Sequence, residues 1–137
     1  MVFNDFKPTT QLLGRWQPWH KGHTELFKRA LAETGQVIIM VRTVPQKEDA
    51  SGGRTMVQDD NPFKASDVIA NIKKVLELNG YKYGEKYVIR LVPNIVDISY
   101  GRGVGYTFTE HDLGEEIHNI SATKIRQTMR DTGELEI

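Results

Sequence analysis

The first third of the chain alternates between the hydrophobic periods of strands and helices. Residues 11–16 predict a short strand that runs into a glycine-containing loop, and residues 22–34 predict a helix. The apolar face of that helix consists of Leu26, Phe27, Ala30 and Leu31. Gly35 stands at the expected C-cap, and residues 37–41 form a continuous apolar run typical of a strand buried on both faces. This order of elements predicts a βαβ unit with parallel strands.

The rest of the chain continues the alternation after one long interruption. Residues 44–61 are polar, contain several turn formers and show no period, which predicts a long loop. The elements expected after it are a helix at about 66–79, a strand at 87–92, a glycine-rich loop at 99–106, a strand at 116–120 and a helix from Ser121 to about 131. The whole pattern predicts an α/β fold, a three-layer α/β/α sandwich with a Rossmann-like, mainly parallel sheet.

Composition limits the size, partners and compartment of the protein. With 137 residues, of which 39% are hydrophobic, the chain predicts a single domain over 1–137. Its 18 basic and 18 acidic residues cancel, so no bulk field favours nucleic acid or a membrane as a partner. The absence of cysteine excludes thiol chemistry, and without a signal-like N-terminus we expect a cytoplasmic protein. Small size and exposed sheet edges are compatible with a homodimer.

The segment with the clearest chemistry lies between the first strand and the first helix. It reads Gly14-Arg-Trp-Gln-Pro-Trp-His20-Lys-Gly-His23. In a parallel sheet this segment falls beyond the carboxyl ends of the strands, where ligands bind. His20 and His23 stand three residues apart at a helix start, so both rings can face one anionic ligand. From spacing alone, the pair is also compatible with surface residues, or with a metal site completed by His111, His118 or a carboxylate.

A second polar segment opens the last predicted helix. It reads Ile120-Ser-Ala-Thr-Lys-Ile-Arg126. Ser121 is a good N-cap, and Arg126 stands about a turn and a half into the helix, from where a guanidinium can bind a phosphate in a bidentate manner. Taken alone, a serine cap followed by solvated basic residues explains this segment as well.

Together the two segments resemble the signatures of the cytidylyltransferase-like nucleotidyltransferases. The first is similar to the family's His-x-Gly-His motif and the second to its Ile-Ser-x-Thr-x-x-Arg motif, in the family's order. The aromatic lead-in of the first segment and Asn61-Pro-Phe63 are similar to archaeal-type nicotinamide-nucleotide adenylyltransferases. The resemblance implies an enzyme that transfers a nucleoside monophosphate from a nucleoside triphosphate to a phosphate-bearing small molecule and releases pyrophosphate.

The resemblance also implies roles for individual residues. Both histidines would donate hydrogen bonds to the triphosphate, and Arg126 would add positive charge. The residues implied at the nucleotide are Gly14, Arg15, Trp16, His20, His23, Ile120, Ser121, Thr123 and Arg126. Mg²⁺ would arrive with the nucleotide, coordinated by phosphates and water, with no metal site of the protein's own.

Two loops are expected to complete the site. In the loop at 44–61, family members carry a basic residue that closes over the phosphates and the acceptor. Here that catalytic residue would be Lys47, which we favour, or Arg54. In the glycine-rich loop, Tyr100 and Gly101 are expected to shape the pocket for the base or the acceptor, although a plain turn explains these glycines too.

Two departures from the family pattern refine the prediction. Cytidylyltransferases for glycerol phosphate or choline phosphate carry an arginine before the Ile-Ser pair, where this chain has Glu116-Ile-His-Asn119. The missing arginine favours adenine, and therefore ATP, over cytosine. Trp16 and Trp19 stand where phenylalanine is common; either can stack on a ligand ring, and we expect at least one to pack against the sheet.

Three alternative functions remain open from the sequence. One is a cytidylyltransferase that acts on a polyol or choline phosphate. Another is a non-catalytic nucleotide-binding module, against which the complete set of both histidines, Ser121 and Arg126 argues. The last is a metal-dependent hydrolase built on the histidine pair.

Overall fold

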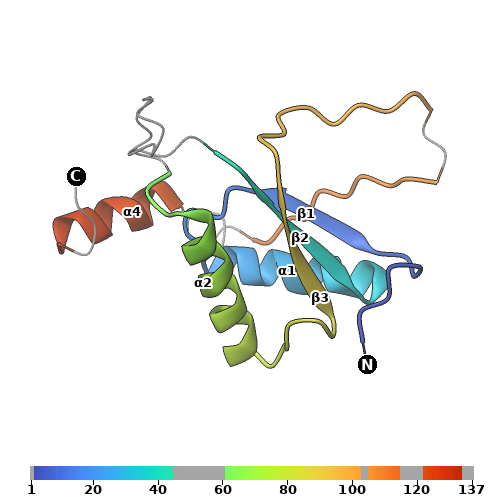
Figure 1. Ribbon diagram of the computed structural model, residues 1–137, viewed down its shortest axis with the longest axis horizontal. Helices are drawn as coiled ribbons and strands as arrows, with labels where there is room; N and C mark the ends of the chain where they lie inside the picture. The colour runs from blue at the N-terminus through green and yellow to red at the C-terminus, as the bar shows by residue number, and fades with distance from the viewer. Residues whose placement is uncertain (1, 45–60, 103–104, 115–121, 134–137) are drawn as a thin grey trace.

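The predicted alternation of strands and helices is present in the computed structural model, which describes residues 2–44, 61–102, 105–114 and 122–133 (Figure 1). Its elements are β1 (Thr10–Gly14), α1 (Lys21–Thr34), β2 (Val37–Arg42), α2 (Ala65–Leu78), β3 (Tyr87–Val92) and α4 (Ala122–Asp131). Each of these elements was expected within one or two residues of its observed bounds. The strand expected at 116–120 lies outside the described residues.

The three strands form one parallel sheet in the order β1-β2-β3. In the register of this sheet, Leu12 lies opposite Ile39, which lies opposite Ile89. Parallel neighbours need a crossover connection, and α1 supplies one between β1 and β2 while α2 supplies the other. The sheet and its crossovers confirm the predicted Rossmann-like α/β fold. All three strands end at the same edge of the sheet, where the β1–α1 loop begins.

Both crossover helices cover the same face of the sheet. Residues of β2 alternate between buried and half-buried along its length. The buried half belongs to one core cluster with Phe27 of α1 and Ile72 of α2, both 0% exposed. Two right-handed crossovers that step in the same direction along a sheet place their helices on one side. The expectation that β2 is buried on both faces was therefore wrong, and α1 and α2 form a single layer.

The first helix ends where the sequence predicts. Gly35 is its C-cap, in a left-handed conformation with φ 90°, and its amide donates to the carbonyl of Leu31 at 2.7 Å. A residue with a β-carbon would be strained in this conformation, which explains the glycine. No helix among the described residues has both the length and the apolar character to cross a membrane.

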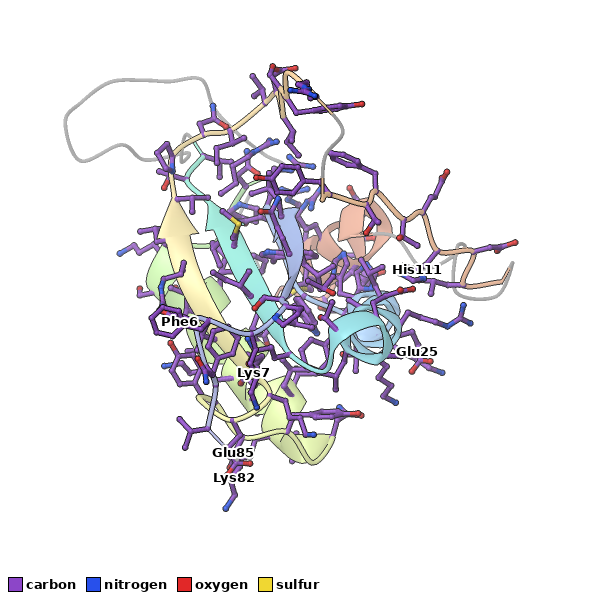
Figure 2. The ribbon with its side chains drawn as sticks, turned by 90° about the vertical axis from the view of Figure 1, so that its right-hand side faces the viewer. Phe6, Lys7, Glu25, Lys82, Glu85 and His111 are labelled. Atoms are coloured by element: carbon purple, nitrogen blue, oxygen red, sulfur yellow. The ribbon has the colours of Figure 1, made fainter. Side chains whose placement is uncertain are left out.

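The two ends of the sheet carry different structures. At the amino end of β3, Lys82 and Glu85 point away from the molecule (Figure 2). The carboxyl ends lead toward α4, while the chain from β3 extends outward and returns past α1 (Figure 1). On the return, Arg29 of α1 donates to the carbonyl of Asp112 at 3.1 Å. The β1–α1 loop and α4 thus lie together beyond the carboxyl ends of the strands.

Candidate active site

His20 and His23 close the start of α1 with their side chains. His20 is the N-cap, and its Nδ1 accepts a hydrogen bond from the amide of Gly22 at 3.0 Å. The Nδ1 atom of His23 accepts in turn from the amide of His20 at 3.1 Å. The two rings are stacked, with their centroids 3.7 Å apart. The structure thus brings both rings together beside the helix start, and their contact with one anionic ligand stays a prediction.

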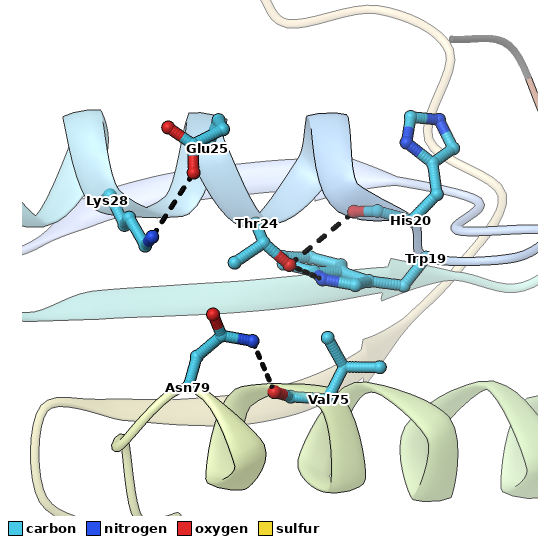
Figure 3. A network of polar contacts seen from close by, with 7 residues as sticks. All are labelled: Trp19, His20, Thr24, Glu25, Lys28, Val75 and Asn79. Carbon is cyan, nitrogen blue, oxygen red and sulfur yellow. Dashed lines mark hydrogen bonds and ion pairs between the residues drawn. The ribbon is translucent and has the colours of Figure 1, made fainter. Parts of the chain in front are cut away.

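These hydrogen bonds determine which ring nitrogen carries the proton. A nitrogen that accepts from a backbone N–H cannot itself be protonated, so Nδ1 is bare in both rings. A neutral imidazole has one proton, which therefore resides on Nε2. Each histidine thus uses Nδ1 to satisfy an amide of the helix start and keeps an Nε2–H donor for a ligand. The His20 ring points away from the hydrogen bonds of Thr24 (Figure 3).

Burial holds both rings in the neutral form. Desolvation, with a smaller contribution from the charge of the neighbouring His20, lowers the pKa of His23 to about 3. Desolvation also lowers the pKa of His20 below its usual 6.5. Near neutral pH, the site therefore presents two neutral hydrogen-bond donors. No acidic residue stands in the first turn of α1, so nothing there opposes an anion at the positive end of the helix dipole.

One backbone amide at the start of α1, that of Gly22, is hydrogen-bonded within the protein. The amides at the start of a helix commonly bind anions. The amide of Gly22 instead donates to the imidazole of His20. This amide is therefore not available to a ligand.

Two buried indoles form the wall behind the histidines. The ring of Trp16 meets the ring of His23 edge-to-face at a centroid distance of 4.9 Å, and the ring of Trp19 lies 5.5 Å from it. Trp16 and Trp19 are 6% and 3% exposed. Both tryptophans pack in the core, as expected for at least one of them. The indole of Trp19 donates to the hydroxyl of Thr24 at 2.9 Å (Figure 3).

The β1–α1 loop is tied to the segment that precedes α2. The side-chain amide of Gln17 donates to the carbonyl of Phe63 at 3.0 Å and accepts from the amide of Phe63 at 2.9 Å. Arg15 Nη1 donates to Asn61 Oδ1 at 3.1 Å. Among the described residues, no carboxylate forms an ion pair with the Arg15 guanidinium. Gln17 and Asn61 are 4% exposed each.

Arg126 connects α4 to the same loop. Its side chain is 1% exposed, and Nη1 donates to the carbonyl of Gln17 at 2.6 Å. The structure therefore brings Arg126 to the β1–α1 loop, which is where the sequence places the triphosphate. Its contact with a phosphate stays a prediction.

The remaining predicted site residues divide into two groups. Lys47, Arg54, Ile120 and Ser121 lie outside the described residues, as does the side chain of Thr123. Tyr100 and Gly101 are described and exposed. Tyr100 stacks on Phe108 with a centroid distance of 5.3 Å. A β-carbon on Gly101 would meet no atom within 4 Å, so close packing does not require this glycine.

Sequence reasoning missed the polar residues that assemble the site. Gln17 and Asn61 were quoted only as parts of motifs, and Thr24 was not singled out. For Gln17 the available signal was an uncharged polar residue between Trp16 and Pro18, whereas Asn61 ends a polar stretch and gave no such signal. A buried amide needs hydrogen-bond partners, but a sequence does not name them.

Among the described residues, no three histidine, aspartate or glutamate side chains are grouped to hold a metal ion. His118, which the metal-site alternative also invoked, lies outside those residues. The Nδ1 atoms of both histidines are occupied by amide protons. The groups that the described part of this segment presents are two imidazoles and the guanidinium of Arg15.

Comparison with known proteins agrees with this site. Residues 12–98 match the family model described as cytidylyltransferase-like, which is more than half of the chain. The chain belongs to the cytidylyltransferase-like family.

Similar curated proteins are named nicotinamide-nucleotide adenylyltransferase. One, from Methanococcus maripaludis strain S2, is 33% identical over 77% of this chain and 57% of its own length. A second, from strain C6 of the same species, is 29% identical over 88% of this chain and 77% of its own length. One from Thermoplasma acidophilum is 39% identical over 48% of this chain and 32% of its own length. The chain thus spans little more than half of the first of these relatives.

Proposed function

We propose that this protein transfers AMP from ATP to a nicotinamide mononucleotide, forming a dinucleotide and releasing pyrophosphate. The observation that carries the proposal is the pair of stacked, neutral histidines with Nε2–H donors at the start of α1, directly after the loop that carries Arg15. Membership of the cytidylyltransferase-like family supports nucleotidyl transfer. The names of the similar proteins support adenylyl transfer and this acceptor.

The chemistry of the reaction fits two neutral donors. A phosphate oxygen of the acceptor attacks the α-phosphorus of ATP, a new P–O bond forms, and the bond to the β-phosphate oxygen breaks as pyrophosphate leaves. The attacking phosphate is already ionised near neutral pH, so no general base is needed. Catalysis then consists of alignment and of hydrogen bonds to the phosphoryl oxygens as charge develops on them. His20 and His23 supply those donors, and Arg15 and Arg126 add positive charge.

Mg²⁺ would be held by the phosphates of ATP and by water. Such an ion commonly keeps several waters and is held largely by the phosphates of its nucleotide. Bound there, Mg²⁺ would neutralise part of the phosphate charge.

Lys47 or Arg54 would approach the phosphates from the 44–61 loop, and Ser121 and Thr123 would bind the β- and γ-phosphates. The cysteine-free sequence supports work in a reducing compartment such as the cytoplasm.

A thermal-shift panel of nucleoside triphosphates with Mg²⁺ tests the choice of nucleotide. Binding to the native state raises the melting temperature, by an amount that grows with ligand concentration over Kd. We expect ATP to raise it and CTP to leave it nearly unchanged at equal concentration. A response to CTP alone would replace adenylyl by cytidylyl transfer, and no response to any triphosphate would remove the transferase proposal.

The variant His20→Ala tests the role of the histidine pair. Removal of one hydrogen-bond donor to the developing charge is expected to lower kcat by roughly 100-fold. Nucleotide affinity should fall by much less, because this donor acts mainly in the transition state. Isothermal titration with ATP and a pyrophosphate-release assay measure the two quantities. Equal losses in kcat and affinity would show that His20 only binds nucleotide.

A further inference from the structure

Trp16 has a backbone conformation that is costly for its residue type. Its φ is 54°, and among the described residues it is the only residue other than glycine with a positive φ. Left-handed φ is rare for bulky residues because the β-carbon crowds the backbone, and such strain persists where surrounding contacts impose it. The contacts of Trp16 therefore need to account for it.

Two contacts hold the Trp16 side chain against the sheet. Its indole Nε1–H donates to the carbonyl of Met40, in β2, at 3.1 Å. Its ring lies over Gly14, where an added β-carbon would come within 2.9 Å of Cε2 and Cζ2. The left-handed backbone turns the indole onto the sheet, and the hydrogen bond fixes its rotation. The indole of Trp16, which belongs to the β1–α1 loop, is thus fixed in position relative to β2.

The other side of this indole contacts His23. The two rings are nearly perpendicular, at 83°, with centroids 4.9 Å apart. The hydrogen bond to Nδ1 holds one atom of the His23 ring, and the stacked His20 ring covers one face. Neither contact by itself stops the imidazole from tilting about the bonded nitrogen. The perpendicular indole restrains that remaining movement.

Trp19 also lies near His23 but has a different anchor. Its Nε1–H donates to Thr24, which belongs to α1 itself. Trp19 therefore moves with the helix that carries His23. Trp16, by contrast, contacts both the His23 ring and the backbone of β2, so it fixes the position of the imidazole relative to the sheet.

We propose that Trp16 is a positioning residue that holds the His23 imidazole so that its Nε2–H points at the triphosphate. This inference rests on the proposed function. Trp16 itself then acts through His23, and its indole fixes where the donor lies relative to the carboxyl ends of the strands. Phenylalanine at this position would keep the perpendicular ring and lose the hydrogen bond to Met40.

The kinetic test compares Trp16→Leu, Trp16→Phe and the control Phe27→Leu. Phe27 is a fully buried aromatic of α1 with ring contacts to Tyr81 and Tyr87, so its variant reproduces the loss of core packing without touching His23. Trp16→Leu is expected to lower kcat about tenfold with less than about a twofold change in the KM for ATP, because a misplaced donor costs turnover. Trp16→Phe should recover most of kcat, and Phe27→Leu should lower the melting temperature alone.

A double variant separates positioning from general damage. In a His23→Ala background, Trp16→Leu is expected to change kcat by less than about twofold, since residues that act through one another are not additive. The same tenfold loss in both backgrounds, or no loss in either, would overturn the inference while leaving the proposed function intact. If the wild-type protein transfers no AMP, the proposed function fails. NMR of the histidine rings, which needs no activity, then tests whether Trp16 holds the His23 imidazole in place.

Long-range ¹H–¹⁵N NMR of the histidine rings reads the position of the proton without any activity. The wild-type spectrum should show His23 with bare Nδ1 and protonated Nε2. Trp16→Leu should leave that tautomer unchanged, because the amide of His20 still donates to Nδ1, but it should increase the mobility of the His23 ring in ¹³C relaxation measurements. Phe27→Leu should leave that mobility unchanged. Unchanged mobility of the His23 ring in folded Trp16→Leu would overturn the inference. If Trp16→Leu does not fold, Trp16→Phe carries the same test, with a smaller increase in mobility expected.

Discussion

At the scale of single residues, the two histidines serve the fold and the chemistry with different atoms. Nδ1 of each ring satisfies a backbone amide at the start of α1. Nε2 is left with the proton and faces away from those amides. A capping box is usually made by hydroxyl and carboxyl groups, and here two imidazoles make it. The sequence could predict that the pair shares a ligand, but not which nitrogen meets it.

The pH dependence of stability should report the burial of His23. Its pKa is about 3 in the folded protein and about 6.5 in an unfolded chain. Between these values the unfolded state binds more protons, so the free energy of unfolding is expected to fall as the pH drops from about 6.5 toward 3, by at most about 1.4 kcal/mol per pH unit for this group. His20 acts in the same direction.

Urea unfolding at several pH values, in the wild type and in His23→Gln, measures this effect. The variant has no imidazole at this position, so its stability should fall less steeply over the same range. Equal slopes for the two proteins would mean that His23 titrates normally when folded.

Gly14→Ala should disturb the indole wall. The new β-carbon would lie 2.9 Å from the Trp16 ring, which is held by Met40 and packed against His23. Overpacking of this kind is expected to lower the free energy of unfolding by about 1–3 kcal/mol. Gly101→Ala is the matched control, because its β-carbon meets open space. Equal free energies of unfolding of the two variants in urea would show that the Trp16 ring moves aside without cost.

At the scale of elements, polar side chains hold together loops that are distant in sequence. Gln17 pairs with the backbone of Phe63 as a neighbouring strand would, and so joins the start of α1 to the start of α2. Arg126 joins α4 to the same loop through the carbonyl of Gln17. Three separate segments thus meet around one glutamine.

Gln17→Met should loosen this junction. The substitution keeps the shape of the side chain but leaves the amide and carbonyl of Phe63 without their partners, at an expected cost of about 1–3 kcal/mol. Native-state hydrogen exchange should become faster at Phe63. Gln127→Met, on the exposed side of α4, is the control and should change stability by less than about 0.5 kcal/mol. Unchanged exchange at Phe63 in Gln17→Met would contradict the role of this pair.

The elements were predictable from the sequence because local patterns specify them. Phe27 and Ala30 mark the buried face of α1, and Gly35 marks its end. Burial of β2 on one face was not predictable, because it depends on where both crossover helices pack. The burial of Arg126 against Gln17 depends on a contact across 109 residues, which no local pattern contains. Motifs therefore located the site, whereas only the fold shows how its parts are joined.

At the scale of the whole molecule, the segments that carry the candidate site lie at the carboxyl ends of the strands. The β1–α1 loop, the start of α2 and α4 lie beyond the carboxyl ends of the strands (Figure 1), and hydrogen bonds of Arg15, Gln17 and Arg126 join them. This is where a doubly wound α/β sheet binds its ligands. The family of the chain and its two neutral donors support the nucleotidyl transfer that we propose for this site.

Transfer of label from ATP carrying a radioactive α-phosphate to nicotinamide mononucleotide, with Mg²⁺ present, tests the central claim most directly. The account predicts a labelled dinucleotide and an equal amount of pyrophosphate. Replacement of both His20 and His23 by alanine should lower the rate by more than about 100-fold. No labelled dinucleotide from the wild-type protein, or release of labelled AMP without any acceptor, would contradict it.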